Sequence, residues 1–177
     1  MTILDLTLPL NPNMAVYPGD PPVEIDTVHT LETHGWELRR ISLGTHAGTH
    51  VNVPSHMISG GASLADLPLT RFQGPTVLWR PGSDAPSGLG LIVAGPGLDM
   101  DLVPVVLAAA PPFVGFPVEA EPDPDVEKAL LAAGIVVYEN LLGVDRLSSV
   151  QSFQFWGLPL TIMDGDGSPI RAVALVD

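Results

Sequence analysis

A helix that leads through one short turn into a buried strand is the feature that most constrains the fold of this chain. The segment 123–140, DPDVEKALLAAGIVVYEN, offers Asp123 or Asp125 as a helix N-cap and Gly134 as the residue that ends the helix. Leu130 and Leu131 are expected to face inward, and IVVYEN is expected to form a strand. This arrangement is typical of α/β folds.

Most of the other regular segments are typical of strands. Strands are predicted at 2–8, 23–31, 36–46, 75–80, 89–95, 111–117, 153–163 and 169–177. The segment 63–70 predicts a helical turn with Ser63 as N-cap, and 101–110 predicts a helix weakened by Pro104. Few helices and many strands predict an α/β single domain over residues 1–177, with a mixed, strand-rich central β-sheet.

Charge and composition exclude several classes of function. The formal net charge is −13 and Lys128 is the only lysine, so no nucleic-acid partner is expected. No apolar run reaches the roughly 18 residues of a membrane span, and the N-terminus lacks a signal-peptide pattern. We therefore expect a cytoplasmic protein with no membrane partner. The chain has no cysteine, so a transition-metal site would have to use histidine and carboxylate.

Three of the five histidines lie within eleven residues, in HAGTHVNVPSH at 46–56. The glycines and the proline of this stretch disfavour a helix and favour a strand that ends in a relaxed loop. Gly48 would let the backbone fold so that His46 and His50 converge. If the chain is extended beyond His50, Asn52 and His56 lie on the same side. The pattern predicts a metal or catalytic site, whereas the other two histidines, His29 and His34, lack partners and suggest no function.

The histidine segment resembles the H-x-G-T-H-x-D-x-P-x-H signature of the metal-dependent cyclase family, to which bacterial kynurenine formamidase belongs. Four further stretches resemble the family in the same order: VYPGDPP (16–22), ISLGTHAGTH (41–50), LLAAGIVVYENL (130–141) and DGSPIRAVAL (166–175). The resemblance fails between about 80 and 115, where the chain is short. It implies an α/β fold with a large central sheet, a homodimer or homotetramer, and hydrolysis of amide or ester bonds with divalent ions.

The resemblance also implies roles for individual residues. His46, His50, Asn52, Glu127 and Glu139 fall at the family's metal-ligand positions. His56 matches the proton donor and acceptor, and Tyr17 matches an aromatic position that contacts substrate. Ordinary alternatives stay open for four of these residues. His56 could be a further ligand and Tyr17 a turn residue, Glu139 could be a solvated acid at a strand end, and Glu127 could be an acid favoured near a helix N-terminus.

Two of the ligand positions depart from the family pattern. Asn52 stands where the family has an aspartate, and Glu127 stands where it has a histidine. The two changes leave the formal charge of the ligands unchanged, so we expect a divalent ion to bind. An amide bridges two cations poorly, so we expect one firmly bound ion and a weak second one. Zn²⁺ is the first candidate for this ion. Mn²⁺ and Mg²⁺ are alternatives, because a larger share of oxygen ligands shifts the preference of a site toward them.

These residues predict a metal-dependent hydrolase of a small amide, ester or lactone. An arylformamide such as N-formylkynurenine is one candidate substrate, with His56 as the acid and base. The alternative is a catalytically altered member of the family that binds a metal or a small molecule. Asn52 and Glu127 motivate that alternative, together with Phe116, which occupies the place of a family aspartate.

Overall fold

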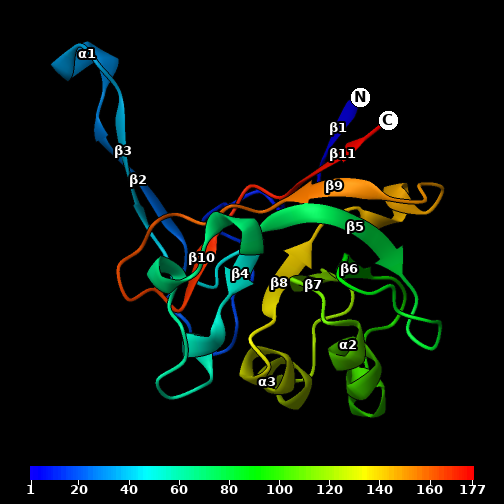
Figure 1. Cartoon of the computed structure of the whole chain (residues 1–177). Coiled ribbons are helices and arrows are strands. Elements are labelled where there is room, and N and C mark those ends of the chain that lie inside the picture. Colours follow the sequence, from blue (N-terminus) through cyan, green and yellow to red (C-terminus); the bar gives the residue numbers. More distant parts are fainter.

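A nine-stranded mixed sheet forms the centre of the molecule in the computed structural model, which describes all of residues 1–177. The strand order is β1–β11–β9–β5–β6–β7–β8–β4–β10, and β5 to β8 run parallel while the other neighbours are antiparallel (Figure 1). The strands are β1 (Thr2–Asp5), β4 (His50–Asn52), β5 (Gln73–Trp79), β6 (Gly90–Val93), β7 (Phe113–Pro117), β8 (Val136–Leu141), β9 (Phe153–Trp156), β10 (Gly167–Pro169) and β11 (Val173–Val176). The predicted α/β class with a mixed central sheet is confirmed.

Two helices, α2 (Val103–Ala109) and α3 (Pro124–Ala132), lie side by side beneath the sheet (Figure 1). The side chain of Asp123 accepts a hydrogen bond from the backbone N–H of Asp125, so Asp123 is the N-cap of α3. Pro104 lies in the first turn of α2, where its missing N–H costs no helical hydrogen bond, so the predicted weakening of this helix was wrong. Ser63 starts a 3₁₀ turn at Leu64–Asp66, and its predicted capping role is confirmed by the bonds between Ser63 and Asp66.

The two faces of the sheet bury separate cores. One core packs α2 and α3 against the sheet and includes Leu130, Leu131 and Phe116. The other core packs the ring of Phe155 against Phe113 and Tyr138 on the opposite face, with centroid distances of 5.2 and 4.9 Å. Successive residues of a strand point to opposite faces, so β8 sends side chains into both cores, whereas β4 sends Val51 into the core opposite the helices. The polar side chains of β4 and β8 lie on the α3 side, beyond the edge of the helix-covered core.

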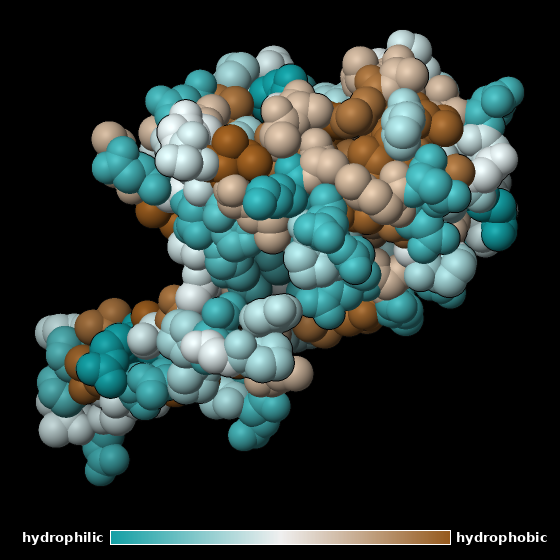
Figure 2. All heavy atoms as spheres, turned by 90° about the horizontal axis from the view of Figure 1, so that it is seen from below, coloured by the Kyte–Doolittle hydropathy of each residue, from teal (hydrophilic) through white to brown (hydrophobic).

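A hairpin of β2 (Glu24–His29) and β3 (Leu38–Ser42), capped by the short α1 (Leu31–His34), projects from the body of the molecule (Figures 1 and 2). We call residues 24–42 the arm. Both strands were predicted, but they pair with each other and not with the central sheet. Strand β3 therefore does not lead directly into the histidine segment, as the sequence suggested, because β3 ends at Ser42 and a turn follows.

The histidines of the arm have partners that the sequence did not indicate. The rings of His29 and His34 stack at 4.4 Å, and Trp36 approaches His29 at 5.3 Å. Helix α1 explains this contact, because its single turn folds the chain back on itself between the two strands.

The helices of the structure are all too short, or too polar, to span a bilayer.

Candidate functional site

Pairing between β4 and β8 assembles the centre of the site. His50 lies directly opposite Glu139 in this antiparallel pair, and Asn52 lies on the same face of β4 as His50. Helix α3 brings Glu127 from its first turn toward the same point. The four side chains are buried, with exposed fractions of 9% or less. The structure thus brings together residues that lie up to 89 positions apart in the sequence.

The loop before β4 fixes the ring of His50. Gly48 has φ = +67°, and a Cβ atom there would lie 2.8 Å from Leu10, so the predicted role of this glycine in turning the chain is confirmed. The carbonyl of Gly48 accepts a hydrogen bond of 2.9 Å from Nδ1 of His50. This bond places the proton on Nδ1 and leaves the lone pair of Nε2 directed at the cavity, as in histidines that bind metals. Burial lowers the pKa of His50 to about 4, which keeps the ring neutral.

A single amide joins the two buried carboxylates. The Nδ2 group of Asn52 donates to Oε1 of Glu127 at 2.5 Å and to Oε1 of Glu139 at 2.7 Å. Burial and the neighbouring charges of Glu127 and Glu121 raise the pKa of Glu139 to about 8. Two carboxylates confined in so small a space repel each other, and a bound cation would relieve that repulsion. The oxygen and imidazole atoms gathered here are the donors that divalent ions prefer, so this group fits such an ion.

Three further side chains form a second group beside the first. Oδ2 of Asp166 lies 2.9 Å from Nε2 of His46 and 3.4 Å from Nδ1 of His56, and these three residues could hold a metal ion. Nδ1 of His46 lies 2.8 Å from Oδ1 of Asn52, which joins the two groups. Partial burial acts to raise the pKa of Asp166, but its hydrogen bonds with His46, Thr45 and His56 outweigh burial and lower the pKa to about 2.

Asp166 is the residue that reasoning from sequence missed. Its surroundings, DGDGS, have the composition of a turn, although Asp166 is the first residue of the segment 166–175 that resembles the closing strand of the family. The backbone carbonyl of Asp166 accepts from the N–H of Val53, and its Oδ1 accepts from the hydroxyl of Thr45 at 3.0 Å. These bonds hold the loop before β10 against the histidine segment. The position of Asp166 at the start of the segment 166–175 was the signal that could have identified it.

His56 reaches the site by a route that differs from the predicted one. The chain is extended only as far as Val53, and Pro54–His56 forms a 3₁₀ turn. The prediction of an extended segment through His56 was therefore wrong, because Pro54 starts a helical turn at its N-terminal end. The turn nevertheless brings the ring of His56 to 4.1 Å from that of His46.

The two groups open into a cavity of about 580 Å³. Tyr17 lies at the mouth of this cavity, on the loop before β2, and 62% of its surface is exposed. The six other candidate site residues also line the cavity: His46, His50, Asn52, His56, Glu127 and Glu139. A volume of this size suits a small organic molecule. The cavity therefore brings all seven candidate site residues to one space, and Tyr17 is the exposed one among them.

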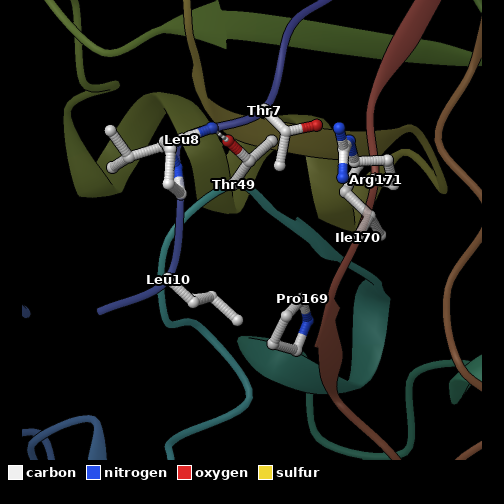
Figure 3. A pocket seen from close by; sticks show the side chains of 8 residues that line it. Thr7, Leu8, Leu10, Thr49, Pro169, Ile170 and Arg171 are labelled. Carbon is white, nitrogen blue, oxygen red and sulfur yellow. Dashed lines mark hydrogen bonds between the residues drawn. The ribbon is translucent and has the colours of Figure 1, made fainter. Parts of the chain in front are cut away.

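A second, smaller cavity of about 220 Å³ lies near β10 and carries no acid or histidine (Figure 3). The hydroxyl of Thr49 accepts from the N–H of Leu8 there and donates to the carbonyl of Asn140. Arg171 also lines this cavity, but Asp5 engages its guanidinium at 2.6 Å. The polar side chains of this cavity are thus already hydrogen-bonded, mostly to residues outside it, and Thr49 anchors the segment that carries His50.

Comparison with known proteins places the chain in a family. A family model described as "Putative cyclase" matches residues 4–89. Kynurenine formamidase from Salinibacter ruber is 30% identical over 211 residues, covering 98% of this chain and 97% of the relative. Kynurenine formamidase from Bacillus cytotoxicus is 28% identical over 203 residues, covering 96% and 95%. The chain belongs to the cyclase family.

The fold is shared with solved structures at lower identity. Isatin hydrolase A from Labrenzia aggregata, bound to benzyl benzoate, superposes with a TM-score of 0.85 at 21% identity, covering 99% of this chain and 93% of that one. A novel cyclase structure superposes with a TM-score of 0.81 at 16% identity, covering 99% and 88%. The mixed sheet with few helices is thus the fold of the family.

The raised pKa of Glu139 predicts how stability depends on pH in the metal-free protein. An acid whose pKa is higher in the folded state than in the unfolded state keeps its proton better when folded, so stability falls as pH rises toward that pKa. His50, whose pKa is lowered to about 4, acts in the opposite direction but only below its ordinary value of 6.5. Between pH 6.5 and about 8 we therefore expect the melting temperature of the chelator-treated protein to fall, and Glu139→Gln to flatten this decline.

Proposed function

We propose that this chain is a metal-dependent hydrolase of small amides, esters or lactones, with arylformamides as the first substrates to test. The observation that carries the proposal is the buried group of His50, Asn52, Glu127 and Glu139 beside His56, in a chain whose full-length relatives are kynurenine formamidases. Their substrate class is the natural starting point, because the match spans nearly the whole of both chains.

A divalent ion would be held by His50, Asn52, Glu127 and Glu139, with His46 completing the set from the adjoining group. We propose Zn²⁺ first, with Mn²⁺ or Mg²⁺ as alternatives, and one firmly bound ion per chain with any second one weaker. When bound, such an ion polarises a carbonyl group and lowers the pKa of water from about 15.7 toward about 7. The amide of Asn52 carries no charge, so the formal ligand charge of −2 comes from Glu127 and Glu139.

His56 is proposed to move the proton of the reaction. Its Nδ1 faces Asp166, which leaves Nε2 as the atom that takes a proton from the attacking water. The oxygen of that water bonds to the substrate carbonyl carbon, the C–N or C–O bond breaks, and Nε2 of His56 returns the proton to the departing amine or alkoxide. Tyr17 is proposed to contact the substrate at the mouth of the cavity.

The alternative function is that of a catalytically altered family member that binds a metal or a small molecule. The observation that favours it is the bond pattern of Asn52, whose amide N–H groups occupy both carboxylates. An aspartate at this position could not donate those hydrogen bonds. The two functions make opposite predictions about turnover by the native chain.

The test is to load the metal-free protein with Zn²⁺ or Mn²⁺ and to assay a formanilide, a lactone and an aryl ester. We expect turnover of at least one, and a loss of about 100-fold or more in kcat for His56→Ala. The same assays on Asn52→Asp combined with Glu127→His decide the alternative. Activity that appears only in this double variant would establish the binding protein and rule out the hydrolase.

We also propose that the protein self-associates through the arm. The family resemblance implies a homodimer or homotetramer, and a homodimer is the state that we propose first. A two-stranded hairpin is at best marginally stable alone, and the apolar side chains of this one are exposed: Val28, Leu31, Trp36, Leu38 and Ile41 (Figure 2). A second copy would cover both arms by a two-fold contact. Light scattering after gel filtration should give twice the 18.6 kDa chain mass. The double variant Trp36→Ser with Leu38→Ser should halve the measured mass, whereas the control Met163→Ser, at another exposed site, should leave it unchanged.

A cytoplasmic location remains a prediction.

A further inference from the structure

We propose that the cavity selects its substrates by charge and prefers neutral or amine-bearing aromatic amides and esters over those that carry a carboxylate. This inference rests on the proposed hydrolase function and narrows its substrate class. The observation behind it is the wall of the cavity, which contains four carboxylates but neither lysine nor arginine.

The basic residues of the chain lie elsewhere. Lys128 is exposed on α3, one residue after Glu127, and does not line the cavity. The guanidinium groups of Arg40 and Arg171 pair with Asp26 and Asp5. A carboxylate on a substrate loses its hydration water when it enters the cavity, and this desolvation is the main free-energy cost of transferring an ion into a protein. No lysine or arginine side chain lines the cavity to offset that cost.

Two of the four carboxylates stay unpaired when the site holds its ion. Glu127 and Glu139 offset the two positive charges of a divalent cation, whereas Asp20 and Glu121 are not among its ligands. Asp20 lies on the loop that carries Tyr17, and Glu121 lies on the connection between β7 and α3. Glu121 is exposed and Asp20 lies three residues from the exposed Tyr17, so we expect both acids to act on the outer part of a substrate. The net charge of −13 adds to the same bias.

The remaining wall favours an uncharged hydrocarbon body. Leu8, Val16, Tyr17, Met57 and Val118 line the cavity together with the acids. Such side chains contact an aromatic ring without regard to its charge, so they hold the substrate while the acids discriminate among ring substituents. An ammonium group on the ring would gain from Asp20 and Glu121, and a carboxylate at the same place would be repelled.

Three formanilides that differ only at the para position test the inference: one with methyl, one with aminomethyl and one with carboxylate. In metal-loaded protein at low salt, we expect kcat/KM for the methyl compound to exceed that for the carboxylate by about tenfold, and the difference to shrink in high salt. Electronic effects of the substituents on the leaving amine are removed by comparing variants, because they are the same for every variant.

Glu121→Gln should raise the kcat/KM ratio of the carboxylate to the aminomethyl compound by about fivefold, and Glu121→Lys should raise it further. The matched control is Glu119→Gln, which removes an exposed acid two residues away that does not line the cavity. It should leave the ratio unchanged. Equal ratios in wild type, Glu121→Gln and Glu121→Lys would overturn the inference and leave the hydrolase intact.

Calorimetric binding of the same three compounds keeps this test separate from that of the proposed function. If none of them is hydrolysed, the dissociation constants still decide the question of charge. Weaker binding of the carboxylate compound, relieved in Glu121→Lys, would support selection by charge in a protein that is not an arylformamidase. Binding of the carboxylate compound as tightly as the methyl compound would refute it.

Discussion

Replacing His50 by alanine should weaken the binding of Zn²⁺ or Mn²⁺ by about 100-fold or more. Removing only the hydrogen-bond partner of a metal ligand lowers metal affinity by about 10- to 100-fold, and removing the ligand itself should lower it further. The ring is buried, its Nδ1 is anchored on Gly48, and its Nε2 faces the cavity. Titration of the metal-free protein with each ion, followed by calorimetry, measures the effect. Hydrolysis of a formanilide should fall in parallel.

His34→Ala is the matched control for this experiment. It removes the same side chain from the exposed tip of the arm, where His34 stacks on His29 and does not line the cavity. Metal affinity should be unchanged in this variant. A His50→Ala protein that is folded by circular dichroism and binds metal as tightly as the wild type would remove His50 from the ligand set.

Phe155→Ala should lower the free energy of unfolding by about 3–5 kcal/mol, since it empties a fully buried ring position in the core opposite the helices. Phe155 contacts both Phe113 and Tyr138, and the hydroxyl of Tyr138 donates to the carbonyls of Phe72 and Gly157. These rigid neighbours limit how far the cavity can collapse. Urea unfolding followed by tryptophan fluorescence gives the value.

The neighbouring residue supplies the control for the core experiment. Trp156 points to the other face of β9 and is 44% exposed, so Trp156→Ala should cost clearly less, about 1 kcal/mol or under. Unfolding should then be followed by circular dichroism, because a fluorophore is lost. Similar losses for the two variants would contradict the assignment of Phe155 to the core.

Local signals predicted the parts of the fold that depend on short stretches of chain. Asp123 caps α3 and Gly134 follows it with φ = +75°, so the helix and the strand after it were predictable from one segment. The arm was not, because alternation of polar and apolar residues is typical of any half-buried strand. Whether such a strand joins the central sheet depends on contacts with distant segments, which periodicity does not record.

The residues of the site likewise fall into those that the sequence could predict and those that it could not. The spacing of His46 and His50 around Gly48, and the place of Asn52 on the same side of an extended segment, were visible in the sequence. The family resemblance supplied Glu127 and Glu139 as candidates. Asp166 lies 120 residues from its partner His46, in a stretch whose composition is that of an ordinary turn. Its place at the start of the segment that resembles the closing strand was the one signal in the sequence, and the packing of that turn against the histidine segment shows that its side chain belongs to the site.

The exposed arm has a consequence for how assembly can be observed. Its backbone amides are held by one pair of strands without a core beneath them, so in an isolated chain they should undergo hydrogen–deuterium exchange through frequent local unfolding. Contact with another surface would slow that exchange far more than exchange in the central sheet. Labelling kinetics of residues 24–42, followed over a dilution series, would thus report directly on association.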